Sequence, residues 1–154
     1  MNILVCVKQV PDTTEIKIDP VTNTLIRNGV PSIVNPFDGY ALEAAARIKD
    51  KHPDTRIIVL SMGPEQAKNA LKECLGIAAD KAYLISGRAF GGSDTLATSY
   101  ILSCAIKTVA VLAGGFDAIF CGKQAIDGDT AQVGPEIAEH LGLPQVTYAL
   151  EAEL

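Results

Sequence analysis

The sequence predicts a doubly wound α/β fold with a mainly parallel sheet of five strands. Short apolar runs alternate along the chain with longer segments whose apolar residues recur at helical spacing. A run that is apolar on both faces, such as Ile3 to Val7, is typical of a parallel strand covered by helices. Strands that alternate with helices imply right-handed crossovers and helices on both sheet faces.

The predicted strands are short and rich in aliphatic residues. They cover residues 3–7, 56–60, 81–86, 117–121 and 145–150. A small peripheral hairpin is predicted at 15–19 and 24–27, where polar and apolar residues alternate around a Pro-Val-Thr-Asn turn.

Four helices are predicted between the strands. Asn35-Pro36 begins the first, with proline at the first helical position, and its apolar face extends to Ile48. The others cover 67–78, 96–112 and 136–141. The third is apolar nearly all round, so it must be covered on more than one side. Its five polar residues make it a buried helix and too polar to span a membrane: Thr98, Ser99, Ser103, Lys107 and Thr108.

Composition indicates a single soluble domain that covers residues 1–154. Of the 154 residues 48% are hydrophobic and 20% are charged, and the net charge of −5 offers no basic face to nucleic acid or anionic lipid. The four cysteines lie far apart without a CxxC spacing, which predicts reduced thiols in a cytoplasmic protein and no metal site. No membrane insertion is expected.

The stretch from Gly122 to Pro135 is the strongest candidate for a binding site. It lies between a predicted strand and a predicted helix and is rich in Gly, Asp and Thr, so its N–H groups could approach a phosphate. Thr130 and Gln132 could add side-chain hydrogen bonds. The alternative is an ordinary turn in which Asp129 or Thr130 caps the helix. Pro135 predicts either a kinked helix or a helix whose first residue is Pro135.

Strand order places this loop among other polar loops. In the common order 3-2-1-4-5, a ligand binds beyond the carboxyl ends of strands one and four, where the topology switches. The walls of that site would be residues 6–12, 61–64 and 122–134. Because these are also the most irregular polar loops, a nucleotide site is favoured over an ordinary turn.

Four motifs together are similar to a known family. They are Val5-Cys6-Val7-Lys8-Gln9-Val10-Pro11-Asp12, Val34-Asn35-Pro36-Phe37-Asp38, Ser61-Met62-Gly63-Pro64 and the stretch 122–134. In order and spacing they resemble the beta subunit of electron-transfer flavoproteins along the whole chain. The resemblance implies an adenine-nucleotide alpha-hydrolase-like fold and a heterodimer with an alpha subunit.

In that family the beta subunit binds AMP as a structural ligand, or a second FAD in the electron-bifurcating branch. The amino-acid sequence of residues 127–135 is more similar to that of the second branch, whose beta-subunit flavin accepts hydride from NADH. The resemblance also implies longer beta subunits. This chain stops before the segment that wraps the alpha subunit and carries the loop that docks on dehydrogenases.

Site residues follow from the resemblance by position. Cys6 would meet the adenine through its backbone, and Met62 would pack on the adenine ring. The residues expected beside the adenosine are Asn35, Pro36, Phe37 and Asp38. The residues expected to hold ribose and phosphates are Gly122, Lys123, Gln124, Ala125, Ile126, Asp127, Gly128, Asp129, Thr130, Ala131, Gln132 and Val133. Taken singly, Cys6 and Met62 could instead be core residues, and Asn35 a helix cap.

Three functions therefore stand as hypotheses. The first is an electron carrier without a catalytic residue, which passes electrons between NADH or acyl-CoA dehydrogenases and a quinone reductase or other acceptor. Such a carrier is not a stand-alone enzyme, although a bifurcating flavin would oxidise NADH. The second is a non-redox ATP- or AMP-binding module. The third is an adenylating enzyme, suggested by Phe90-Gly91-Gly92-Ser93-Asp94-Thr95, a signature that follows the third strand instead of the first and so better predicts a helix cap.

Overall fold

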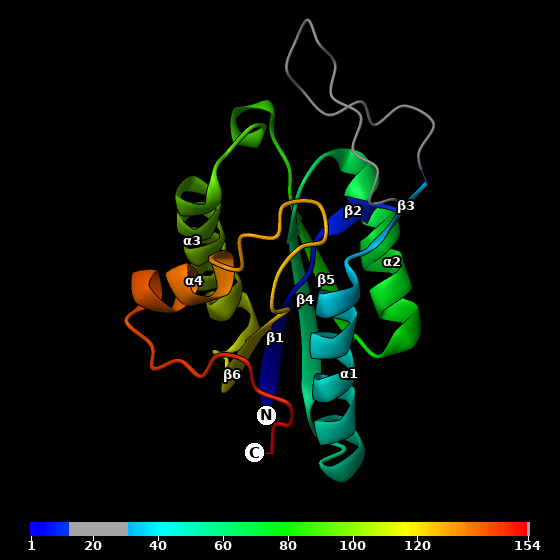
Figure 1. The fold of residues 1–154 in the computed structure, drawn as a ribbon. Helices are drawn as coiled ribbons and strands as arrows, with labels where there is room; N and C mark the ends of the chain where they lie inside the picture. Colours follow the sequence, from blue (N-terminus) through cyan, green and yellow to red (C-terminus); the bar gives the residue numbers. More distant parts are fainter. Residues whose placement is uncertain (13–30, 154) are drawn as a thin grey trace, which may run out of the picture.

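Four parallel strands form the sheet, in the order β5-β4-β1-β6 (Figure 1). The computed structural model describes residues 1–12 and 31–153. The strands are β1 (Asn2–Cys6), β4 (Arg56–Met62), β5 (Lys81–Ile85) and β6 (Ala118–Cys121). The predicted α/β fold is confirmed, and the first four strands have the expected order.

Helices cover both faces of this sheet (Figure 1). They are α1 (Pro36–Lys51), α2 (Lys68–Ile77), α3 (Thr95–Ala113) and α4 (Val133–Leu141), with short 3-10 turns η1 (Glu65–Ala67) and η2 (Arg88–Phe90). The pair α1 and α2 lies on one face and the pair α3 and α4 on the other, which gives three layers.

The central strand β1 contributes to both halves of the core. Ile3 and Val5 pack among the residues of α1 and α2, whereas Leu4 and Cys6 pack among those of α3 and α4. All four are buried, as the continuous apolar run predicts. The carboxyl end of β1 is thereby fixed between two layers, and the loops at this end are held in place.

A second, two-stranded sheet was not predicted. Gln9–Pro11 (β2) pairs antiparallel with Ser32–Val34 (β3), so that Val10 lies opposite Ile33. Strands of three residues carry too few apolar positions to show a period. The hairpin predicted at 15–19 and 24–27 lies outside the described residues.

The predicted fifth strand is wrong. Residues 145–150 form no strand in the structure, and Val146 is 87% exposed. Tyr148 has a φ of 55°, a left-handed conformation that no extended strand accommodates. Beyond it the chain returns to α1, where Glu153 pairs with Lys51 at 2.9 Å.

Helix α3 departs from its prediction in exposure. It buries one face, which includes Leu102 and Ile106, while Leu96, Tyr100 and Val111 on its other side are exposed. By length and composition alone α3 could cross a membrane. The expectation that its polar residues make it too polar to span is therefore wrong. The buried face packs on the sheet, as in the core helix of a folded domain.

Helix α4 begins before its proline. Its first residue is Val133 and its N-cap is Gln132, with no side-chain capping bond, so neither Asp129 nor Thr130 is the cap. Pro135 lies in the first turn, where its missing N–H would have no helical partner, and so neither the predicted kink nor a start at Pro135 is needed.

Candidate functional site

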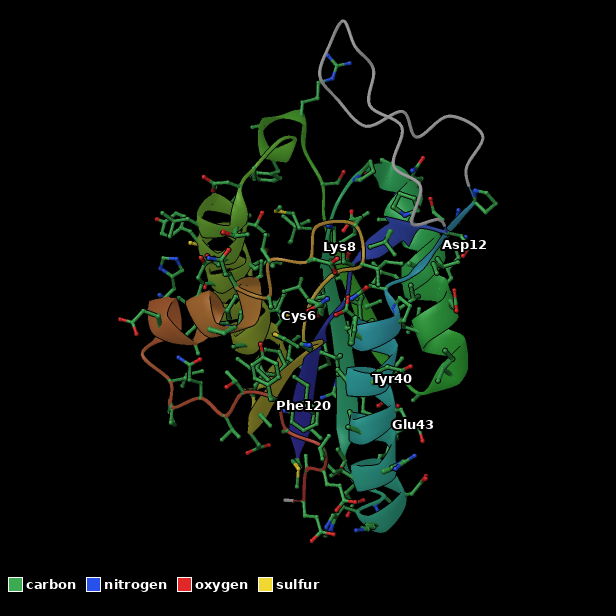
Figure 2. All side chains as sticks on the ribbon, viewed as in Figure 1. Cys6, Lys8, Asp12, Tyr40, Glu43 and Phe120 are labelled. Carbon is green, nitrogen blue, oxygen red and sulfur yellow. The ribbon has the colours of Figure 1, made fainter. Side chains whose placement is uncertain are left out.

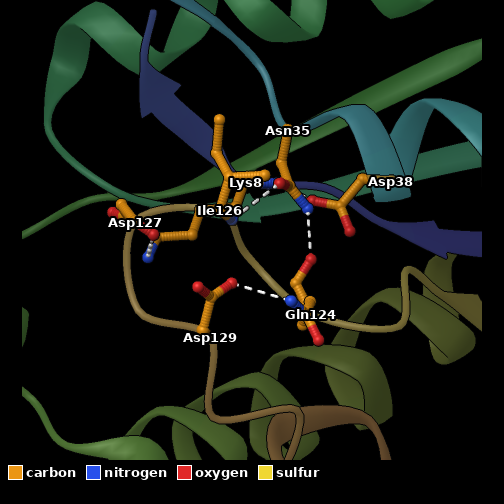
Figure 3. Close-up of polar contacts among 7 residues, drawn as sticks. All are labelled: Lys8, Asn35, Asp38, Gln124, Ile126, Asp127 and Asp129. Atoms are coloured by element: carbon orange, nitrogen blue, oxygen red, sulfur yellow. Dashed lines mark hydrogen bonds and ion pairs between the residues drawn. The ribbon is translucent and has the colours of Figure 1, made fainter. Parts of the chain in front are cut away.

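Three segments far apart in sequence meet at the carboxyl edge of the sheet. They are the end of β1 at residues 6–8, the start of α1 at 35–38, and the loop 122–134 between β6 and α4, and we call their meeting point the junction (Figure 3). Cys6 and Lys8 lie at the upper end of β1, beneath this loop (Figure 2). The junction coincides with the switch point between β1 and β6 that the sequence predicts as a ligand site.

Asn35 fastens the loop to α1. Its side-chain Nδ2 donates to the carbonyl oxygen of Gln124 at 2.8 Å, and its Oδ1 accepts from the N–H of Ile126 at 3.1 Å (Figure 3). Asn35 is completely buried and makes no side-chain capping bond to α1. Asn35 is thus the N-cap residue of α1, as predicted, but its side chain holds the loop and does not cap the helix.

Asp38 fastens the end of β1 to the same helix. Its Oδ2 accepts from the backbone N–H of Lys8 at 2.8 Å. Burial raises the pKa of Asp38 to about 6, although the N–H groups of Lys8 and Gly122 and the side chain of Asn35 oppose that rise. A carboxyl group placed this way is a structural acceptor that titrates closer to neutral pH than an exposed aspartate.

Gly122 lets the loop leave β6 directly against α1. A Cβ at this position would lie 2.6 Å from the carbonyl carbon of Phe37 and 2.7 Å from the backbone nitrogen of Asp38. Such distances exclude any side chain, so the glycine is required for this close approach.

Two polar pairs hold the middle of the loop. The Nζ of Lys8 pairs with Oδ1 of Asp127 at 2.7 Å, and the Nε2 of Gln124 donates to Oδ1 of Asp129 at 2.7 Å (Figure 3). Asp127 has only 6% of its side chain exposed, whereas Lys8 has 47% exposed. The sequence predicts Lys8 only as part of the wall 6–12 and gives it no role of its own. Its position directly after the first strand was the signal that could have found it.

The last part of the loop offers backbone donors. Asp129 and Ala131 adopt left-handed conformations with φ of 53° and 55°. Within the described ranges, the N–H groups of residues 130–134 donate to no backbone acceptor. A backbone that includes left-handed residues can turn successive N–H groups toward one point, and such loops before a helix are typical of anion-binding sites.

Cys6 belongs to the core cluster on the α3 and α4 side of the sheet, and Met62, Cys121 and Val133 pack against that cluster. Cys6 is opposite Cys121 in the parallel pairing of β1 with β6. A hydrogen bond with the Cys121 thiol, together with burial, raises the pKa of Cys6 well above its usual range. The Cys6 thiol therefore stays protonated and packs as an apolar group at neutral pH.

Two sequence-predicted features lie apart from the junction. The ammonium group of Lys123 is 5.2 Å from the ring centre of Tyr148, so its side chain extends toward the C-terminal segment. The 90–95 segment contains the N-cap of α3, where Asp94 accepts from the N–H of Ala97 at 2.8 Å. The helix-cap interpretation of that segment is confirmed.

Pro36 and Phe37 lie in the first turn of α1. Their predicted place beside an adenosine stays a prediction. Phe37 packs edge-on against Tyr40, with ring centres 6.2 Å apart.

Comparison with known proteins identifies the family. The electron transfer flavoprotein domain matches residues 22–154. The chain is 63% identical to the electron transfer flavoprotein subunit beta of Megasphaera elsdenii and 60% identical to that of Clostridium acetobutylicum, with all of this chain and 58% and 57% of those proteins aligned. It is also 58% identical to subunit CarD of the caffeyl-CoA reductase-Etf complex of Acetobacterium woodii, over all of this chain and 57% of that subunit.

The chain thus spans a little over half the length of the curated relatives it matches. The four motifs that resemble this family lie in a fold whose strand order is the one predicted from the sequence. The chain belongs to the electron transfer flavoprotein family, and its curated relatives include beta subunits of that family.

Proposed function

We propose that the junction binds an adenine nucleotide, FAD in preference to AMP, and that the chain works as an electron carrier together with an alpha subunit. The observation that carries this proposal is the loop itself: residues 130–134 present backbone N–H groups without a backbone partner, and Asn35 holds the loop over the end of β1. Donors fixed in this way bind a phosphate without the cost of ordering the loop.

The residues around the junction fit such a ligand. Met62 is partly buried against the core cluster that contains Cys6, and a polarizable thioether suits the face of an adenine ring. Gln132 and Thr130 are exposed on the loop and can donate to ribose or phosphate oxygens. Asn35 and Asp38, whose side chains already bind the protein's own backbone, would position the site without touching the nucleotide through those side chains.

When a flavin is bound, its isoalloxazine ring supplies the redox chemistry. The chain's own residues would hold the adenosine and phosphates and fix the cofactor relative to the partner subunit. No acid or base in the chain needs to take part. The preference for FAD over AMP rests on the similarity of residues 127–135 to the bifurcating branch, in which NADH is the electron donor.

The partners are proposed from the relatives. Their names describe beta subunits and a subunit of a caffeyl-CoA reductase complex, which supports an alpha subunit as the first partner. A CoA-ester dehydrogenase or reductase and a quinone reductase are the redox partners expected of such a carrier. The proposed location is the cytoplasm.

Identification of the retained nucleotide tests the proposal. The chain, purified with any partner it retains, is denatured, and the released small molecule is identified by mass spectrometry and visible absorption. FAD supports the bifurcating carrier, and AMP supports the structural-ligand type. Retention of ATP, with no flavin in the presence of an alpha subunit, would favour a non-redox nucleotide-binding module instead.

A single substitution connects that nucleotide to the loop. A Cβ on Gly128 would meet no atom within 4 Å, so Gly128→Val should leave the fold intact. We expect it to abolish nucleotide retention by obstructing the approach of phosphate to the backbone. Unchanged retention in a folded Gly128→Val protein would contradict the proposed role of the loop.

A further inference from the structure

The junction is acidic for a site that binds phosphate. Asp127 and Asp129 lie on the loop, the carboxyl group of Asp38 is buried beside it, and the whole chain carries a net charge of −5. The loop's own cation, Lys123, extends toward Tyr148. Among the described residues, Lys8 is the cationic side chain that forms an ion pair with this loop.

Lys8 is held in place at three points. Its N–H donates to Asp38 at 2.8 Å, its carbonyl oxygen accepts from the N–H of Asn35 at 2.8 Å, and its Nζ pairs with Asp127 at 2.7 Å. Asp127 lies three residues before Thr130, where the proposed phosphate-binding N–H groups begin. The ammonium group has three N–H donors, and the ion pair with Asp127 uses one of them. With 47% of its side chain exposed, Lys8 keeps donors available to an incoming anion.

We propose that Lys8 is the residue that makes the junction prefer phosphorylated ligands over the bare nucleoside. The inference rests on the proposed function, because it assumes that adenine nucleotides bind at the junction. Asp127 positions the ammonium group beside the loop, and the remaining N–H donors and the positive charge of Lys8 act on the phosphate itself. Removing the charge should weaken binding of AMP and ADP and leave adenosine nearly unaffected.

The test compares Lys8→Met with a matched control, Lys49→Met. Lys49 forms an equally short ion pair, 2.6 Å from Asp80, at the end of α1 away from the junction, so both variants change the net charge equally. Affinities for adenosine, AMP and ADP are measured by calorimetry on nucleotide-free protein. We expect Lys8→Met to lose at least about tenfold in AMP and ADP affinity, as for a lost charged hydrogen bond. Adenosine affinity should change less than about twofold, and Lys49→Met should match the unmodified chain.

The double variant Lys8→Met with Asp127→Asn separates two roles of the lysine. If Lys8 acts on the phosphate, removing the Asp127 charge as well does not restore AMP affinity. Recovery in the double variant would overturn the proposal, since Lys8 would then only neutralise Asp127. An equal loss for adenosine and AMP would also overturn it, because Lys8 would then be a structural clamp.

Failure of the proposed function has a different signature. If the unmodified chain binds neither AMP, ADP nor FAD, the nucleotide site itself is wrong, and the inference about Lys8 is wrong with it. If the unmodified chain binds nucleotide and Lys8→Met keeps the same ratio of AMP to adenosine affinity, the inference alone is wrong. The Lys8→Met loss should also shrink in high salt, because salt screens an exposed charge.

Discussion

Gly122 passes so close to Asp38 that a Cβ on the glycine would lie 2.3 Å from the Oδ1 of the aspartate. The contact joins the end of the outer strand β6 to the start of α1, two elements that are far apart in the sequence. It places the loop 122–134 at the end of β1, so the geometry of the junction depends on a residue without a side chain.

Replacing Gly122 by alanine should therefore damage the fold and the loop together. The added methyl group must displace backbone atoms of α1, and we expect a loss of about 1–3 kcal/mol in the free energy of unfolding. Urea denaturation of Gly122→Ala measures it. Gly128→Ala is the matched control, because its Cβ would have open space, and it should stay within about 0.5 kcal/mol. Equal stability of the two variants would contradict the close approach.

Removing the side chain of Asn35 should release the loop. Asn35→Ala leaves the carbonyl of Gln124 and the N–H of Ile126 without their side-chain partner, which should cost about 2 kcal/mol or more. Nucleotide retention should fall with it. Asn69→Ala, on the exposed side of α2, is the control and should be nearly neutral in a parallel denaturation series. A stable Asn35→Ala protein that retains nucleotide would show that the loop holds its shape without Asn35.

Asp38 should make stability depend on pH in an unusual direction. Its pKa is about 6 in the folded protein and near 3.8 when unfolded, so the folded state binds the proton more tightly. Its contribution is fully present below about pH 4 and is lost as the pH rises through about 6, a loss of roughly 3 kcal/mol. The comparison is the free energy of unfolding of the unmodified chain and of Asp38→Asn across this range.

The difference between those two proteins isolates the Asp38 carboxyl from all other titrating groups. The unmodified chain should lose stability relative to Asp38→Asn as the pH rises from about 4 to 6, with no further change near neutrality. Two curves that run parallel would mean that the carboxyl is not desolvated in solution.

Thiol reactivity should separate the four cysteines. Cys104 is exposed on α3. Burial raises the pKa of Cys74 to about 11. The hydrogen bond with the Cys121 thiol, together with burial, raises the pKa of Cys6. Iodoacetamide at about pH 8 should therefore modify Cys104 well before Cys6 or Cys74. Peptide mass spectrometry of timed samples gives the order. All four should react alike in denaturant, and a folded Cys6 as reactive as Cys104 would contradict its burial.

The sequence predicts the central fold well because each main strand has a strong local signal. Ile3 to Val7 and Ile57 to Leu60 are continuous apolar runs, and the structure buries them completely or almost completely. The 145–150 segment shows the limit of such signals. Its Val, Thr and Tyr favour a strand, but the left-handed Tyr148 and the ion pair of Glu153 with Lys51 depend on the tertiary arrangement, which composition does not reveal.

The candidate site was located by the sequence but its internal roles were not. The Gly-rich loop and Asn35 lie at the predicted edge of the sheet. That Asn35 serves the loop instead of its own helix depends on a partner about 90 residues away, which capping rules do not consider. For the same reason the role of Lys8 within the predicted wall 6–12 was not foreseen, since it depends on an ion pair with a residue 119 positions later.

These long separations determine when the junction can form. The bonds of Asn35 to the loop span 89 and 91 residues, and the pair of Lys8 with Asp127 spans 119. Bringing such distant residues together costs chain entropy before any contact forms. The contacts of β1 and α1 with the loop can therefore form only once the loop after β6 is present. During synthesis, residue 127 must leave the ribosome before the pair of Lys8 with Asp127 can form, so the junction is completed only after most of the chain has been made.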